Sequence, residues 1–272
     1  MTGHVAGPSA GSSGVLFALL ADARLPTGAH TQSAGLEPAL LAGMPVRDVP
    51  AYVAARLATV TRTEAAVAVV ARHAALTVPD ERVALLRSVW RAWAARTPSP
   101  ALRETSQRLG RGYLRLAHRL WPTHPAVLAL DTAMLPLGPL PTRPRGGGRG
   151  ERPGAGGDEG AGVRGGRGER GQPPRAVVLG VVAACVGLDG RQVAQLVGYD
   201  DAQTIASATL KLAPVDPADA TAWVLAAAPL IEEMASSLAR LTDPADIPAT
   251  GAPLLEEWAQ QHTHRTERLF SA

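Results

Sequence analysis

The sequence predicts an all-α protein, a single helical, bundle-like domain of roughly eight to ten helices. The chain is rich in Ala, Leu and Arg, which are good helix formers. Apolar residues recur at three- and four-residue steps in several segments, as they do on one face of a helix. Aromatic residues make up only 4% of the 272 residues and no segment has the character of a strand, so we expect a core of small, closely packed side chains.

The first half of the chain predicts a tail followed by helices. Residues 1–14 are rich in Gly, Ser and Ala without a period, which is typical of a flexible N-terminal tail, and the helical domain is expected to span 15–272. After a first apolar stretch, helices are expected over 33–42, 49–76, 80–95 and 102–120. The last of these has the clearest period, with apolar residues at Leu102, Leu109, Tyr113, Leu116 and Leu120.

A Gly- and Arg-rich insert interrupts the helical pattern at about 138–174. Residues 143–175 alone contain 13 of the 28 glycines and eight arginines. Such a stretch cannot bury enough apolar surface to offset the entropy of ordering it, so we expect it to be disordered. The insert either separates two domains or forms a loop within one bundle, and the sequence leaves both arrangements open.

The second half predicts helices over 175–187, 190–212, 216–241 and 253–269. Asp189 is expected to cap the second of these. Gly198 could break that helix, and Pro229 should kink or divide the next one, because proline lacks the amide donor that a helix interior needs.

The basic charge of the chain belongs to the insert. The net charge is +3, and residues 143–175 carry eight arginines against four acidic residues, so the rest of the chain sums to about −1. A nearly neutral helical body does not indicate a nucleic-acid-binding surface. A helical protein that binds polyanions or nucleic acid through the insert is the alternative function, although the insert lacks interleaved aromatic residues.

The sequence gives no sign of an active site. It contains no Gly-rich nucleotide motif, nucleophile elbow or His-Glu-x-x-His zinc motif, so we expect neither catalysis nor a cofactor. Cys185 is the single cysteine, which excludes an intramolecular disulfide, and its apolar surroundings predict a core position. His262 and His264 are two apart and would point in different directions on a helix, so no metal site is expected. A signal peptide and a membrane-spanning run are both absent, which predicts a cytoplasmic location.

The segment 25–37, LPTGAHTQSAGLE, is polar and lies between two apolar stretches. Pro26 and Gly28 are typical of a turn, and a Thr or Ser within 31–33 could cap the helix that follows. A structural turn does not explain His30, Gln32 or Gly35 so readily. This segment is therefore a candidate surface for a partner.

The same segment resembles the hallmark of the urease accessory protein UreF family, in which a Leu-Pro-x-Gly turn precedes a Ser-x-Gly-Leu-Glu stretch. Three further segments resemble the family in the right order. These are RETSQRLG at 103–110, SATLKL at 207–212 and HRTERLF at 264–270.

The resemblance implies an all-α fold, a homodimer and a role without chemistry of its own. Members of the family bind an accessory protein of the UreD/UreH type and the GTPase UreG, and the assembly inserts nickel into the urease apoprotein. Regulation of the GTPase is also proposed for the family. The resemblance makes Glu37 and Lys211, the only lysine of the chain, candidate contacts to the GTPase, and it makes the C-terminal tail the element that docks on UreD/UreH. The implied partner-binding residues are His30, Gln32, Ser33, Gly35, Leu36, Glu37, Lys211, Arg265, Arg268, Leu269 and Phe270.

Two positions depart from the family pattern. His30 stands where many members have Phe or Tyr. Lys211 is followed by Leu212 and 213–216, Ala-Pro-Val-Asp, which lack the Gly-Gln that often follows the family lysine.

Overall fold

The computed structural model describes residues 13–28, 31–135, 171–263 and 269–270. Within these ranges the chain forms eleven α-helices, two short 3-10 helices and no strand, which confirms the predicted all-α fold class. The α-helices are α1 (Ser13–Ala21), α2 (Leu36–Leu41), α3 (Val49–Ala58), α4 (Val60–Leu76), α5 (Pro79–Arg96), α6 (Pro100–Leu120), α7 (Pro125–Ala133), α8 (Arg175–Cys185), α9 (Gly190–Leu212), α10 (Pro217–Leu238) and α11 (Pro253–Thr263).

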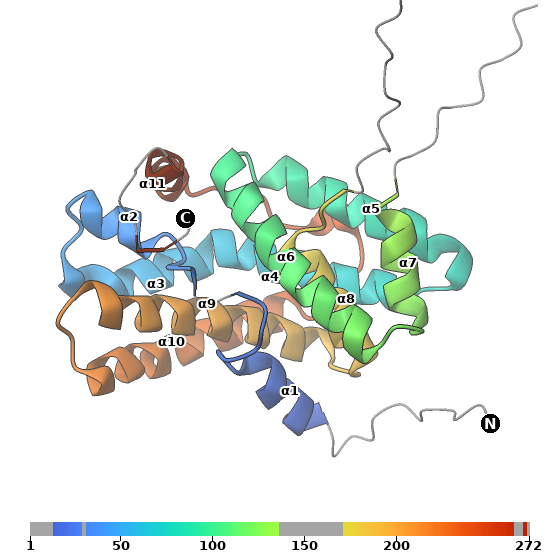
Figure 1. The fold of residues 1–272 in the computed structure, drawn as a ribbon, viewed down its shortest axis with the longest axis horizontal. Helices are drawn as coiled ribbons and strands as arrows, with labels where there is room; N and C mark the ends of the chain where they lie inside the picture. The colour runs from blue at the N-terminus through green and yellow to red at the C-terminus, as the bar shows by residue number, and fades with distance from the viewer. Residues whose placement is uncertain (1–12, 29–30, 136–170, 264–268, 271–272) are drawn as a thin grey trace, which may run out of the picture.

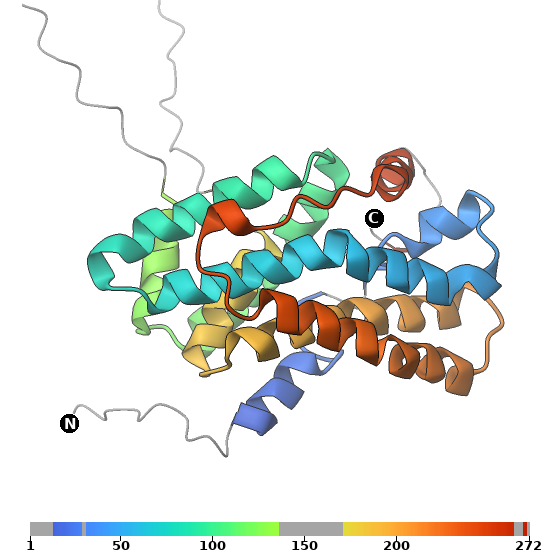
Figure 2. The ribbon, with the colours of Figure 1, turned by 180° about the vertical axis from the view of Figure 1, so that it is seen from behind.

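Helices α4 and α8 form the centre of the molecule. Helix α8 is buried from Ala176 to Cys185, and it packs against α4 on one side and α6 on another. Helices α9 and α10 lie along each other next to α4, and α5 lies along α4 on its opposite side (Figures 1 and 2). The two central helices thus connect the layers of the bundle.

Small side chains set the spacing of this core, as the composition predicted. Helix α4 buries Ala65, Ala68 and Ala71, and Gly180 of α8 lies against Ala68 and Ala71. A Cβ atom at Gly180 would overlap the Ala68 carbonyl oxygen, so these two helices approach as closely as their backbones allow. Dispersion contacts and burial of many small groups therefore replace large aromatic side chains here.

Most predicted helices are confirmed, and the differences have local causes. The helix expected over 49–76 is divided, because Thr59 leaves helical geometry with φ −122° and ψ −98°. Helix α7 was not predicted, since its nine residues are too few to show a period. Asp189 caps α9 in a capping box with Gln192, as expected, and α9 continues unbroken through Gly198. Helix α10 likewise continues through Pro229.

The ends of the insert are only partly described. The predicted N-terminal tail up to residue 12 and the insert up to residue 170 lie outside the described residues. Residues 171–174, which the prediction included in the insert, are ordered, because the Gly171 amide donates to the Met134 carbonyl at 3.1 Å. Cys185 is buried at 7% exposure, as predicted, and its sulfur lies 3.3 Å from His124 Nδ1.

Among the described residues, no helix combines the length and the apolar character that crossing a membrane requires.

Candidate functional site

A strained turn brings the chain into helix α2. Ala34 has φ 51° and Gly35 has φ 75°, so two consecutive residues adopt the left-handed conformation, which is unusual for alanine. Ser33 is fully buried, and its hydroxyl accepts a hydrogen bond from the Glu37 amide at 3.3 Å. The turn therefore sets the direction in which the first residues of α2 point.

The first turn of α2 binds the end of the chain. Glu37 is only 5% exposed, and its carboxylate accepts hydrogen bonds from two consecutive backbone amides, Leu269 at 2.7 Å and Phe270 at 2.9 Å. Carboxylates form shorter and stronger hydrogen bonds to amides than neutral acceptors do. Residues 269–270 are thus fastened to the segment that the sequence marked as a partner surface.

His262, at the end of α11, completes this contact from a third direction. The ring is fully buried, and its Nε2 atom lies 3.3 Å from the nearer Glu37 oxygen and 3.4 Å from the Phe270 carbonyl oxygen. Its Nδ1 atom has no partner among the described residues. Helix α11 also packs against α2 and α6 (Figure 1). His262 therefore connects the chain end to the body of the bundle.

Lys211 covers the other side of the same contact. Its ammonium group lies 5.1 Å from the centroid of the Phe270 ring, within the range of a cation–π interaction. Lys211 is exposed, whereas Phe270 is 5% exposed and lies beneath it. We call these five residues the C-terminal clasp, namely Glu37, Lys211, His262, Leu269 and Phe270.

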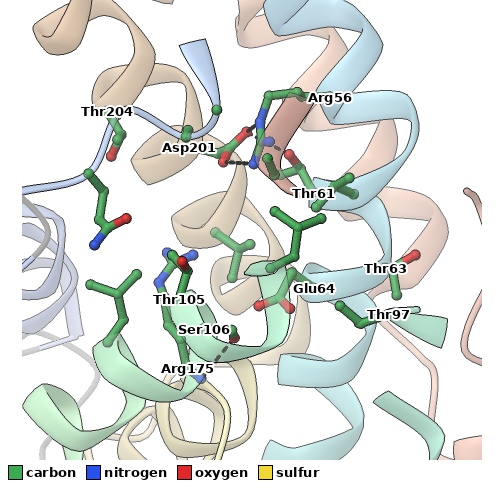
Figure 3. Close-up of a pocket in the computed structure, with 18 of the residues that line it drawn as sticks. Arg56, Thr61, Thr63, Glu64, Thr97, Thr105, Ser106, Arg175, Asp201 and Thr204 are labelled. Atoms are coloured by element: carbon green, nitrogen blue, oxygen red, sulfur yellow. Dashed lines mark hydrogen bonds and ion pairs between the residues drawn. The ribbon is translucent and has the colours of Figure 1, made fainter. Parts of the chain in front are cut away.

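A cavity of about 110 Å³ lies inside the bundle, and the turn residues Ala34 and Gly35 form part of its lining (Figure 3). Arg56 of α3 and Asp201 of α9 both line this cavity, and the Arg56 guanidinium donates two hydrogen bonds, of 2.9 and 2.7 Å, to the Asp201 carboxylate. The Thr61 hydroxyl donates to the same carboxylate at 2.6 Å. Burial alone would raise the pKa of Asp201, but the charge and hydrogen bonds of Arg56 hold it below its usual value.

Glu64 of α4 points into the middle of the cavity (Figure 3). One of its oxygens accepts a hydrogen bond from Trp93 Nε1 at 2.7 Å. Burial raises the pKa of this carboxyl, and the charge of Arg175, which itself pairs with Asp200 at 2.5 Å, offsets the burial only in part. Within the described part of the chain, no group of three His, Cys, Asp or Glu side chains is placed to hold a metal ion.

Comparisons with known proteins agree with one another. The family model described as UreF matches residues 46–228. The urease accessory protein UreF of Mycobacterium sp. (strain JLS) is 31% identical over 255 residues, which cover 93% of this chain and 96% of the relative. The chain belongs to the UreF family.

Other relatives cover similar lengths. The urease accessory protein UreF of Mycobacterium tuberculosis (strain ATCC 25618 / H37Rv) is 32% identical over 254 residues, 92% of this chain and 95% of the relative. That of Mycolicibacterium vanbaalenii (strain DSM 7251 / JCM 13017 / BCRC 16820 / KCTC 9966 / NRRL B-24157 / PYR-1) is 30% identical over 264 residues, 96% of this chain and 100% of the relative. The chain is therefore a member of a family of urease accessory proteins along nearly its whole length.

The structure brings together four of the residues that the UreF resemblance singled out, because Glu37, Lys211, Leu269 and Phe270 all belong to the clasp. Gln32, Ser33, Gly35 and Leu36 lie in or beside the turn that precedes α2, and all four are buried or half-buried. His30, Arg265 and Arg268 lie outside the described residues.

Two components of the site were missed by sequence reasoning. His262 was considered only as a metal ligand or an ordinary histidine, and nothing in its spacing indicates a contact with Glu37. The Arg56–Asp201 pair could not be predicted either, because a single arginine in an amphipathic helix is normally expected to lie on the surface. Both depend on contacts between distant parts of the chain, which only the folded arrangement supplies.

Proposed function

We propose that this UreF family member is a urease-maturation adaptor. In this proposal it binds a UreD/UreH-type accessory protein and the GTPase UreG in the cytoplasm and helps the assembly insert nickel into apo-urease. The observation that supports it is the convergence of Glu37, Lys211 and the chain end, from three distant parts of the sequence, on one clasp. Its contribution is to bind and position proteins, and it supplies no catalytic group.

In this proposal the exposed residues of the clasp contact partners, and its buried residues hold the chain end in place. Leu269 is 61% exposed and Lys211 is also exposed, so they offer an apolar side chain and a positive charge to a partner. Glu37 and Phe270 are buried, so in this proposal they act indirectly by holding the chain end in place. We propose that the chain end, together with Arg265 and Arg268, docks on UreD/UreH and that Lys211 contacts the GTPase.

A second copy of the chain is the proposed occupant of the outer face of α1. This helix carries no charged residue, and its Val15 and Leu19 side chains are 72% and 45% exposed. An uncharged helix with such a face is suited to the homodimer that the family resemblance implies. Replacing Leu19 with Asp should yield a monomer in size-exclusion chromatography if the proposal is right.

Activation of urease in cells tests the adaptor function. Cells that lack this gene but hold the remaining urease genes should regain urease activity when the intact chain is supplied, and a chain lacking residues 146–170 should restore it equally. The ordered residues 171–174 are kept in this deletion because they pack against the bundle. Failure of the intact chain would overturn the proposal, and failure of the deletion alone would favour a polyanion-binding function of the insert.

A further inference from the structure

The turn before α2 is held in a conformation that its own residues do not favour. Ala34 has φ 51°, and a side chain at such an angle is strained, whereas Gly35 adopts φ 75° without that penalty. Strained backbone of this kind persists only where the surroundings fix it. A contact from outside the turn should therefore hold it in place.

The Tyr52 hydroxyl supplies that contact. Tyr52 lies on α3 with 5% exposure, and its hydroxyl donates a hydrogen bond to the Ala34 carbonyl oxygen at 2.8 Å. A Cβ atom at Gly35 would lie only 2.9 Å from the same hydroxyl, so the oxygen is seated directly against the turn. Burial raises the pKa of Tyr52 to about 12, so the hydroxyl keeps its proton and remains a donor across the neutral range.

The helix that carries Tyr52 is held in place by the buried Arg56–Asp201 ion pair. Arg56 lies one helical turn further along α3, and its hydrogen bonds to Asp201 fasten α3 to α9. Lys211 lies on that same helix α9, at its last turn. The helix that carries Tyr52 and the helix that carries Lys211 are therefore joined by the same buried ion pair.

We propose that Tyr52 is a positioning residue of the C-terminal clasp. Its hydroxyl fixes the turn at Ala34 and Gly35, and the fixed turn directs the Glu37 carboxylate towards the Leu269 and Phe270 amides. The link from this role to partner binding rests on the proposed function, whereas the role within the clasp does not.

Hydrogen exchange of the Leu269 and Phe270 amides tests the inference in the full-length chain. Tyr52→Phe keeps the buried ring and removes only the hydroxyl, and it should speed exchange at these two amides about five- to tenfold, the change expected for one lost hydrogen bond. Tyr199→Phe is the matched control, because no hydrogen bond of its hydroxyl is found among the described residues. That control should leave both amides unchanged.

A second substitution separates positioning from general support. Ala34→Gly removes the strain at the left-handed position, so the double variant with Tyr52→Phe should recover most of the lost protection. Unchanged exchange in Tyr52→Phe, equal acceleration of the amides in α8, or no recovery in the double variant would each overturn the inference. If the wild-type chain fails to bind UreD/UreH while these exchange results hold, the proposed function fails and the positioning role stands.

Discussion

The Glu37 carboxylate accepts a hydrogen bond from the Phe270 backbone amide at 2.9 Å, although the two residues are 233 positions apart in the sequence. The start of α2 and the end of the chain therefore form one structural unit. Substitutions in either segment should therefore affect the other.

Glu37→Gln should loosen the chain end. A glutamine keeps one acceptor oxygen but turns an amide group towards the second backbone N–H, and hydrogen bonds to charged groups contribute about 1.5–3 kcal/mol. We expect carboxypeptidase to release Phe270 and Leu269 roughly 10- to 100-fold faster, because the fraction of open chain ends rises by that factor. Glu257→Gln, at an exposed position of α11, should leave the release rate unchanged.

Lys211→Met should separate fold from partner binding. A cation–π interaction at an exposed site contributes about 0.5–1 kcal/mol, so the thermal midpoint should change little. Binding of UreG to the complex with UreD/UreH should weaken clearly, as measured by titration calorimetry. Lys211→Arg preserves the charge but replaces the compact ammonium with a planar guanidinium, so it should bind with intermediate affinity. Wild-type affinity in Lys211→Met would exclude a GTPase contact at this residue.

Arg56→Met should destabilise the whole fold. It leaves the Asp201 carboxylate buried, at 10% side-chain exposure, without its main partner. Breaking a buried pair in this way costs about 3–5 kcal/mol in the free energy of unfolding, which urea denaturation would measure. Arg191→Met breaks the exposed pair with Glu232 and should cost at most about 1 kcal/mol. Equal losses in the two variants would show that the buried pair has no special role.

Glu64→Gln should stabilise the protein at neutral pH. Burial raises the pKa of Glu64 above its usual value, so ionisation favours the unfolded chain. The penalty is complete above the native pKa and disappears below the unfolded value of about 4.3, where both states are protonated. The variant keeps an acceptor for Trp93, so that hydrogen bond is not lost. Its gain in the free energy of unfolding, measured by urea denaturation, should be present at pH 7 and vanish near pH 4. An advantage that does not depend on pH would contradict this assignment.

Local sequence patterns predicted most of the helices but not every helix boundary. The period of 102–120 located α6 almost to the residue, and Asp189 identified the start of α9, because both signals lie within one element. The division at Thr59 lies in a run of β-branched residues, Thr59, Val60 and Thr61, whose lower helix propensity is too weak to mark a boundary within a long helical pattern.

The clasp could be predicted only in part. The family resemblance selected Glu37, Lys211 and the chain end as separate motifs, but no spacing rule places residues more than two hundred positions apart in contact. His262 and Tyr52 were missed for the same reason, because a buried side chain that contacts a distant backbone resembles any other core residue in the sequence. The resemblance thus identified four of the five residues of the clasp, and the fold shows how they are arranged.

The most direct test of the adaptor account is a pull-down with purified UreD/UreH from the same organism. The intact chain should form a complex, and a chain lacking residues 265–272 should not, while circular dichroism shows unchanged helicity in both. Glu37→Gln should bind more weakly than the intact chain. No complex with the intact chain, under conditions in which a known UreF protein binds, or normal binding by the truncated chain, would contradict the account.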